Sequence, residues 1–276
     1  MRYRLLALDV DGTLLDPAGQ LRPAVQQAVT AAQKRGVRVV LCTGRRFRTT
    51  LPLAQQLQLS DPVVVHNGAL VKDLQSGTTL HQCYMSPDVY SHALALLRQG
   101  GAPMVYVDAF PEAVDILTEA LERVHPFQRT YLQDNLTHCR IVTDIDTPPA
   151  YGVVMMSVMA DEAHLRMLRP QVQHALGTQG RVNLLMNKNY QGYILEILHP
   201  SASKWDALQR WAQREGIATE AIMAVGDDEN DLEMIRQAGL GVAMGNAAET
   251  VKAAADFITG SNAEDGLVQA LYRFML

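Results

Sequence analysis

Residues 3–13 read YRLLALDVDGT, and this stretch decides the fold. The apolar run Leu5–Leu8 is short and uninterrupted, as in strands that are buried on both faces of a parallel sheet. Asp9 and Gly12 stop this run, so we expect the carboxylates of Asp9 and Asp11 at the carboxyl end of the strand. Ligands of open α/β sheets bind at that end of the strands. The stretch therefore predicts both a central strand and a candidate site.

The same strand-then-helix pattern recurs outward from this stretch. Near it, apolar spacing predicts a helix over 22–35 and short buried strands over 37–41 and 63–65. Toward the other end we expect, in order, a helix over 205–215, a strand over 222–225, a helix over 228–238, a strand over 241–243 and a helix opened by a capping box at Asn246-x-x-Glu249. This alternation predicts an α/β fold with a doubly wound, Rossmann-like parallel sheet.

The middle of the chain has a different pattern, in which helices and strands do not alternate regularly. We expect helices over 88–99, 111–123 and 161–176, and strands over 104–107 and 153–159. These elements suit a smaller α+β unit. We therefore predict a core domain built from 1–82 and 191–276, interrupted by an inserted α+β cap domain over 83–190.

Composition and charge exclude several classes of protein. The chain has 24 Lys+Arg against 29 Asp+Glu, a net charge of -5, which gives no broad basic field for nucleic acid or an anionic membrane. No apolar run approaches the length of a membrane span or a secretory signal. The three cysteines, Cys42, Cys83 and Cys139, form no C-x-x-C pair and suit reduced thiols. We expect a cytoplasmic protein without nucleic-acid or membrane partners.

Polar motifs follow three of the predicted strands. Asp9-Val-Asp11-Gly12-Thr13 follows the first, Thr43-Gly44-Arg45 follows the second, and Gly226-Asp227-Asp228-Glu229-Asn230-Asp231 follows the strand over 222–225. Lys204 lies where a helix is expected to begin. Because the carboxyl ends of parallel strands share one edge of the sheet, we expect these motifs to meet there.

The residue types in these motifs suit the binding of a metal ion and a phosphoryl group. Neighbouring carboxylates such as those of Asp9 and Asp11 repel each other, and a hard cation offsets that repulsion. Asp227 adds to an oxygen-rich environment of the kind that Mg²⁺ prefers. Lys204 supplies positive charge for a phosphoryl group and Thr43 a hydroxyl donor, while backbone N–H groups around Gly12 and Gly44 complete a cradle for the anion.

Taken together, D-x-D-G-T-L at 9–14, T-G-R at 43–45, Lys204 and G-D-x-x-N-D at 226–231 resemble the haloacid dehalogenase superfamily. The similarity is greatest to its Cof-type phosphatase branch, which carries a C2 (type IIB) cap. The resemblance implies that Asp9 is the nucleophile and a Mg²⁺ ligand. It also implies that Asp11 is the general acid and base and binds the metal through its carbonyl oxygen.

The resemblance assigns the remaining site residues as well. Asp227 would complete the metal ligands, and Asp231 would support the metal or Lys204. The residues expected to bind substrate are Gly12, Thr43, Gly44, Arg45, Lys204 and Asn230, with Thr43 and Lys204 holding phosphoryl oxygens and Asn230 contacting the substrate phosphate. Trp205 departs from the branch, which often has Gly there. Whether His66 or Asn67, at the end of the third strand, contacts substrate is left open by the sequence.

These observations favour hydrolysis of a small phosphorylated metabolite, such as a sugar phosphate, flavin mononucleotide or pyridoxal phosphate. An aspartyl-phosphate would form on Asp9, and the inserted domain would close over the site and exclude water. Two alternatives share the chemistry: phosphoryl transfer to a sugar, as in mutases, and a receiver-like signalling module that holds phosphate on aspartate without turnover. A non-catalytic binder is a third alternative, disfavoured by the intact acid pair and Lys204.

Overall fold

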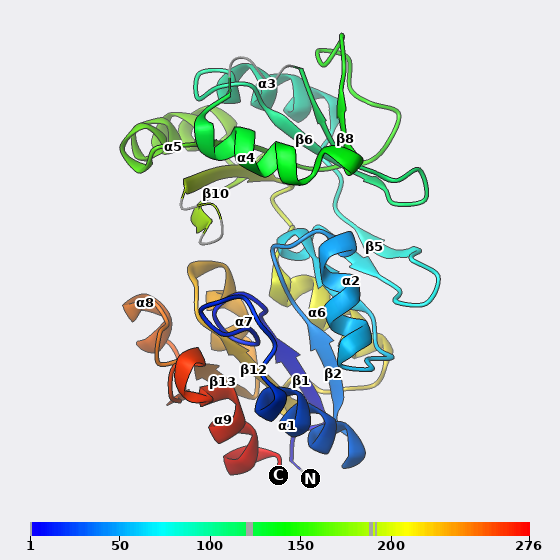
Figure 1. Cartoon of the computed structure of the whole chain (residues 1–276), viewed down its shortest axis with the longest axis vertical. Helices are drawn as coiled ribbons and strands as arrows, with labels where there is room; N and C mark the ends of the chain where they lie inside the picture. The colour runs from blue at the N-terminus through cyan, green and yellow to red at the C-terminus, as the bar shows by residue number, and fades with distance from the viewer. Residues whose placement is uncertain (1, 120–123, 188–189, 191) are drawn as a thin grey trace. The chain divides into compact units, whose positions relative to one another are not determined.

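The chain forms two compact units in the computed structural model, which describes residues 2–119, 124–187, 190 and 192–276 (Figure 1). The first, here called the core unit, consists of residues 1–81 and 203–276. The second, the insert unit, consists of residues 82–202. No helix in the described ranges is long and apolar enough to cross a membrane.

A five-stranded sheet of parallel strands forms the centre of the core unit, in the order β14-β13-β12-β1-β2. The strands are β1 (Leu5–Leu8), β2 (Arg38–Leu41), β12 (Ile222–Gly226), β13 (Leu240–Ala243) and β14 (Phe257–Ile258). The order runs from β1 to β2 on one side and through β12 to β14 on the other, so the switch point lies at β1. The predicted doubly wound α/β fold is confirmed.

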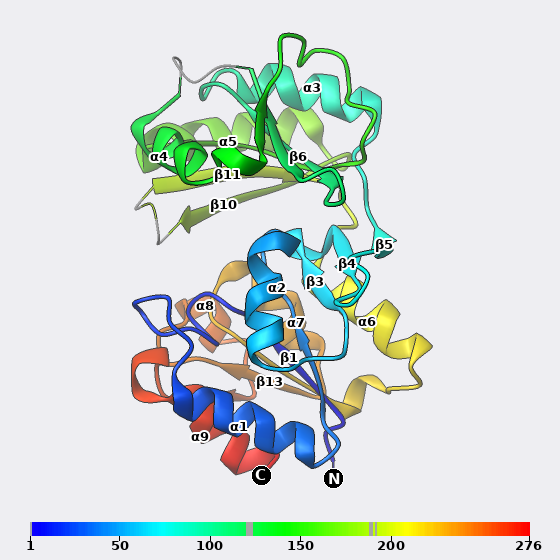
Figure 2. The ribbon, with the colours of Figure 1, turned by 45° about the vertical axis from the view of Figure 1, so that its right-hand side comes forward.

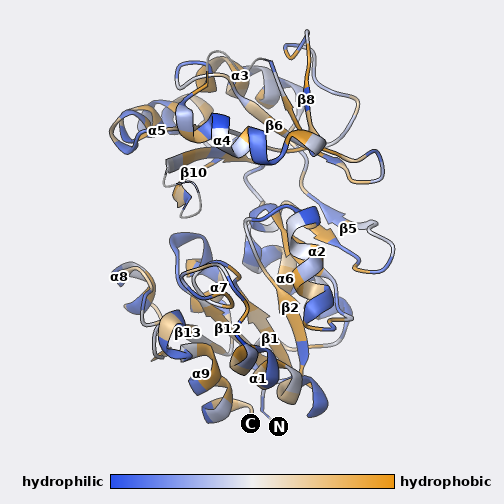
Figure 3. Ribbon diagram, in the orientation of Figure 1, coloured by the Kyte–Doolittle hydropathy of each residue, from blue (hydrophilic) through white to orange (hydrophobic). Residues whose placement is uncertain are grey.

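The apolar run of β1 explains its central position. All four side chains of Leu5–Leu8 are fully buried, and the sheet strands are coloured as hydrophobic in Figure 3. Leu5 and Ala7 pack in one cluster with side chains of α6 (Lys204–Arg214), among them Leu208. Alternation along the strand turns Leu6 and Leu8 to the opposite face. Both faces of β1 are therefore covered, as a parallel strand requires.

Further helices and strands complete the core unit. Helices α1 (Pro23–Lys34) and α9 (Gly266–Phe274) contact each other and lie side by side in Figures 1 and 2. The remaining elements are α2 (Phe47–Gln56), α7 (Leu232–Gln237), α8 (Glu249–Lys252) and a small sheet of β3 (Val63–Val65), β4 (Leu70–Lys72) and β5 (Thr79–Gln82). A parallel bridge between Cys42 and Val64 joins β3 to the end of β2.

The insert unit is a six-stranded sheet with helices packed on it, in the order β10-β11-β9-β6-β7-β8. Its strands are β6 (Met104–Ala109), β7 (Val114–Thr118), β8 (Cys139–Ile141), β9 (Val153–Ala160), β10 (Arg181–Asn187) and β11 (Gly192–Leu198). Its helices are α3 (Pro87–Leu97), α4 (Pro126–Asp134) and α5 (Glu162–Leu176). The pairings are antiparallel except that of β7 with β8.

The helix predicted over 111–123 is wrong. Residues Val114–Thr118 form β7, which pairs with β6 and is buried throughout, and residues 120–123 lie outside the described ranges. Ala113 takes a left-handed φ of 57° in the turn between the two strands. Pairing with β6 and burial of Val114 and Ile116 decide the structure of this segment.

The division between the two units also differs from the predicted one. The core was expected to resume at 191, yet β11 pairs with both β9 and β10 and so belongs to the insert unit. The core unit resumes at Ser203. The sequence does not show this boundary, because the strands with which β11 pairs are known only from the structure.

Candidate active site

Asp9 lies at the carboxyl end of β1, at the switch point of the sheet. Its backbone N–H donates to the carbonyl of Val225 on β12 at 3.0 Å, and the residue is 6% exposed. Its side-chain Oδ1 accepts a hydrogen bond from Nζ of Lys204 at 2.7 Å. Among the described residues, the Asp9 side chain accepts a hydrogen bond through Oδ1 and none through Oδ2. The carboxylate is thus held by one oxygen while the other is uncommitted.

Lys204 is the first residue of α6, and the hydroxyl of Ser203 caps this helix by accepting the N–H of Asp206. The ammonium group is buried and contacts two carboxylates, at 2.7 Å from Asp9 Oδ1 and 2.6 Å from Asp231 Oδ1. Burial alone lowers the pKa of Lys204, but the charges of Asp231 and Asp9 outweigh it and raise that pKa above its ordinary value. Lys204 therefore stays charged at neutral pH.

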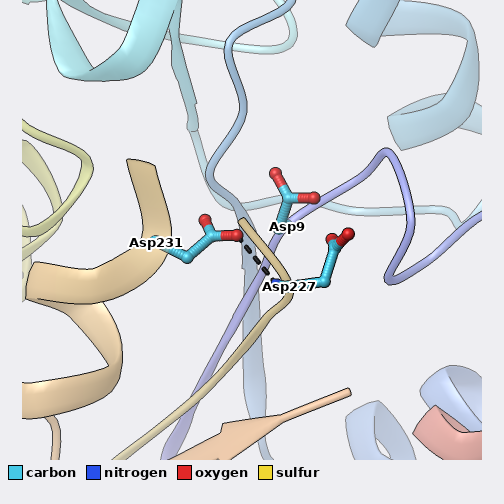
Figure 4. A group of neighbouring side chains, drawn as sticks. All are labelled: Asp9, Asp227 and Asp231. Carbon is cyan, nitrogen blue, oxygen red and sulfur yellow. Dashed lines mark hydrogen bonds between the residues drawn. The ribbon is translucent and has the colours of Figure 1, made fainter. Parts of the chain in front are cut away.

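Asp231 is fully buried and engaged at both oxygens. Oδ1 accepts from Lys204, and Oδ2 accepts the backbone N–H groups of Asp227 at 3.0 Å and Asp228 at 3.1 Å. In Figure 4 its carboxylate turns toward the backbone of Asp227, whereas the carboxylates of Asp9 and Asp227 extend to a common side. Asp231 thus fixes Lys204 and the loop after β12, whereas the carboxylates of Asp9 and Asp227 face a common side.

Negative charge predominates in this cluster. Asp9, Asp227 and Asp231 each place one carboxylate oxygen within 4.8 Å of the other two, and the ammonium of Lys204 pairs with Asp9 and Asp231. Burial and then the charge of Asp231 raise the pKa of the Asp9 carboxyl well above its ordinary value, with Lys204 opposing and Asp227 adding to the rise. A hard divalent cation would offset this repulsion, and the all-oxygen donor set suits Mg²⁺. These residues fit a metal site.

Asp11 lies apart from this cluster of carboxylates. Nε and Nη2 of Arg45 each donate to its carboxylate at 2.6 Å, which makes a bidentate pair. Burial lowers the pKa of Arg45, but Asp11 outweighs this and raises it. The side chain of Asp11 is 41% exposed, so it is accessible from solvent. The expected substrate-binding residue Arg45 and the expected acid Asp11 are therefore partners in this structure.

Thr43 and Gly44 form the start of the loop after β2. The hydroxyl of Thr43 accepts the N–H of Arg45 at 3.1 Å, and the residue is 1% exposed. A Cβ on Gly44 would lie 3.0 Å from Oδ1 of Asn67. The loop is therefore compact, and the small size of Gly44 lets it approach Asn67.

The turn at His66–Gly68 contacts several of these segments. His66, Asn67 and Gly68 all have left-handed backbones, with φ of 49°, 54° and 92°. Asn67 donates its N–H to the carbonyl of Thr43 at 3.0 Å, and its Oδ1 accepts from Nδ2 of Asn230 at 2.9 Å. Such strain in consecutive residues is usual at functional sites. Asn67 therefore connects the loop after β2 with the predicted phosphate ligand Asn230.

Asn246 is a site residue that the sequence prediction placed elsewhere. It was expected to open a helix by a capping box with Glu249, but Ala248 is the N-cap of α8. Its side chain instead donates to the carbonyl of Gly12 at 2.9 Å and to Asp227 Oδ2 at 3.4 Å. Its position shortly after the predicted strand over 241–243 could have identified Asn246 as a site residue, because the other site motifs also follow strands of this sheet.

The buried carboxylates and Lys204 lie at the switch point of a parallel α/β sheet, which is where enzymes of this fold class bind their ligands. The family model for haloacid dehalogenase-like hydrolases matches residues 6–271, and the chain belongs to this family. The resemblance inferred from the motifs, to the Cof-type branch with a type IIB insert, is confirmed.

Named relatives and a solved structure extend over nearly the whole chain. The chain is 27% identical to pyridoxal phosphate phosphatase YbhA of Escherichia coli, over all of both chains. It is 32% identical to the HMP-PP phosphatase of Cronobacter sakazakii, over 88% of this chain and 85% of that protein. A haloacid dehalogenase-like hydrolase from Bacteroides thetaiotaomicron has a similar structure, with a TM-score of 0.81 and 28% identity over 98% of this chain and 99% of that one.

Proposed function

We propose that this enzyme is a Mg²⁺-dependent phosphatase that hydrolyses small phosphorylated metabolites through a phosphoaspartate on Asp9. The observation that carries the proposal is the state of the Asp9 carboxylate. Lys204 holds its Oδ1 at 2.7 Å, and Oδ2 accepts no hydrogen bond within the described residues. A nucleophile needs both a fixed orientation and one uncommitted oxygen.

In the first step, Oδ2 of Asp9 attacks phosphorus and the bond from phosphorus to the leaving oxygen breaks. The leaving oxygen takes the electron pair of that bond and a proton from Asp11, which would act here in its protonated form and not as the ionised partner of Arg45. Lys204 and the hydroxyl of Thr43 would stabilise the negative charge on the phosphoryl oxygens. A Mg²⁺ held by Asp9, Asp227 and the carbonyl oxygen of Asp11 would offset repulsion between the two anions.

In the second step, Asp11 takes a proton from water as the water oxygen attacks phosphorus, and the bond between phosphorus and Asp9 breaks. Phosphate leaves, Asp9 is again a carboxylate, and Asp11 again carries its proton. Arg45 contributes two of its five N–H donors to Asp11. Its remaining donors can bind a phosphoryl oxygen, which would place Asp11 next to the reacting group.

The names of two relatives support the proposed substrate class. Pyridoxal phosphate and HMP-PP phosphatases are named among them. We therefore propose a small phosphorylated metabolite, and within this class a sugar phosphate, flavin mononucleotide or pyridoxal phosphate.

The test is a phosphate-release screen over these compounds with Mg²⁺ and with EDTA. We expect many turnovers per chain with Mg²⁺ and loss of activity after exhaustive treatment with EDTA. A single equivalent of phosphate bound without turnover would indicate a receiver-like module instead. Transfer to a sugar hydroxyl without release of phosphate would indicate a mutase. Full activity in EDTA would contradict the metal requirement.

A further inference from the structure

Asn246 bridges three loops at the edge of the core sheet that carries the site. It follows β13, and its Nδ2 donates to the carbonyl of Gly12 at 2.9 Å, in the loop after β1. The same nitrogen lies 3.4 Å from Oδ2 of Asp227, in the loop after β12. Its Oδ1 accepts the backbone N–H of Asn262 at 2.9 Å. One exposed side chain thus contacts both acid-bearing loops.

The orientation of this amide is determined by its backbone partners. The carbonyl of Gly12 can only accept a hydrogen bond, and the N–H of Asn262 can only donate one. Rotating the amide by half a turn would place oxygen against oxygen at Gly12 and N–H against N–H at Asn262, so both bonds would be lost. Asn246 therefore presents an N–H to Asp227.

Asp227 is held at both carboxylate oxygens by neutral donors. Thr13 Oγ1 donates to Oδ1 at 3.0 Å, and Asn246 approaches Oδ2. The carboxylate also packs directly on the backbone of Gly12, where a Cβ would lie 2.2 Å from Oδ2 and where φ is +94°. The direction in which this carboxylate faces is therefore fixed by the loops after β1 and β13.

We propose that Asn246 is a positioning residue that orients the carboxylate of Asp227 for the divalent cation. The inference rests on the proposed function, because it takes Asp227 as a metal ligand. The side chain of Asn246 contacts Asp227, the Gly12 carbonyl and the N–H of Asn262, so it would act through the metal ligand Asp227. Partners of this kind commonly change metal affinity by about 10–100-fold. Asn246 is exposed, so we expect an effect near the lower end of that range.

The experiment measures Mn²⁺ binding to the metal-stripped full-length chain by electron paramagnetic resonance, without substrate. Asn246→Ala should weaken Mn²⁺ binding about tenfold. The matched control is Asn262→Ala, which removes a side-chain bond to the carbonyl of Leu15 but keeps the backbone N–H that Asn246 accepts. This control loosens the same loops and should keep its Mn²⁺ affinity within about twofold of the wild type. Thermal unfolding of each variant is followed in parallel.

A double-mutant cycle with Asp227→Asn separates positioning from a general effect on the loops. If Asn246 acts through the Asp227 carboxylate, Asn246→Ala should change Mn²⁺ affinity little in the Asp227→Asn background. An undiminished effect there, an equal effect of Asn262→Ala, or unchanged affinity in Asn246→Ala would overturn the inference. Unchanged affinity in Asp227→Asn alone would instead refute the metal assignment in the proposed function, so the two failures are distinguishable.

Discussion

The core unit and the insert unit place their charges differently. In the core unit, Lys204 is buried between the carboxylates of Asp9 and Asp231. In the insert unit, Arg98 pairs with Glu119 and Asp146 at the surface. Desolvation of a buried ion costs roughly several kcal/mol of folding free energy. Exposed ion pairs change the folding free energy by little. The buried cluster is therefore poorly explained by stability alone, whereas the proposed catalytic role would account for it.

Neutral polar groups inside the insert unit are used for structure instead. Gln128 donates to the carbonyl of Ala102 at 2.6 Å and accepts the N–H of Met159 at 2.8 Å, which ties α4 to β9. Thr118 donates to the carbonyl of Pro103 at 3.0 Å. These side chains replace missing backbone partners in the interior. The comparison teaches that the cluster of Lys204 with Asp9 and Asp231 marks the site, while the insert unit has buried acids of its own, Asp115 and Glu196, beside the buried neutral groups that complete its packing.

The largest effect is expected from Asp9→Asn. The amide has nearly the same shape but cannot form the phosphoaspartate, so turnover should fall by about 10⁴-fold or more. Circular dichroism and thermal unfolding should show a folded chain, because a neutral group replaces a buried acid. Steady-state assays on a preparation free of contaminating phosphatase test this prediction. Activity close to that of the wild type would remove Asp9 as the nucleophile.

Lys204→Met tests the comparison of charges directly. Removing one partner of a buried ion pair leaves uncompensated carboxylates, so the metal-free chain should lose about 3–5 kcal/mol of unfolding free energy at neutral pH. The matched change at the surface, Arg98→Met, should have a much smaller effect. Urea unfolding of both variants in EDTA provides the measurement. Equal losses for the two variants would contradict the account of a costly buried cluster.

Ser157→Ala should have the smallest effect and the opposite sign. The Oγ of Ser157 in β9 is fully buried and has no hydrogen-bond partner among the described residues. Removing it should leave stability unchanged or raise it by up to about 1 kcal/mol, because no bond is lost. Thr118→Val, which removes a bond to a buried carbonyl, should instead cost about 1–2 kcal/mol. A larger loss for Ser157→Ala than for Thr118→Val would contradict this.

The sequence predicted the core sheet well for a physical reason. Short apolar runs that end at Asp9, Thr43 and Asp227 define strands and their polar ends together, and parallel topology then brings those ends to one edge. The strand at Val114–Thr118 was missed because its structure depends on pairing with β6, which leaves no local signal.

Contacts between side chains in the site were harder to predict from sequence. The pairing of Asp11 with Arg45, and the contact of Asn246 with Gly12 and Asp227, join loops that are far apart in the chain. The left-handed turn at His66 and Asn67 gave only a weak signal, since neither residue is glycine. Residue types and strand ends predict which loops meet, whereas the partners within them depend on the three-dimensional backbone.

The central claim is that phosphate passes through Asp9, and trapping the intermediate tests it most directly. Asp11→Asn should let p-nitrophenyl phosphate, whose leaving group needs little protonation, react at Asp9 but slow the following attack by water. Rapid-quench experiments should then show a burst of about one p-nitrophenol per active site. With ³²P-labelled substrate, acid-stable and hydroxylamine-labile label should map to the peptide containing Asp9. Label on another residue, or no burst and no label while turnover continues, would contradict the account.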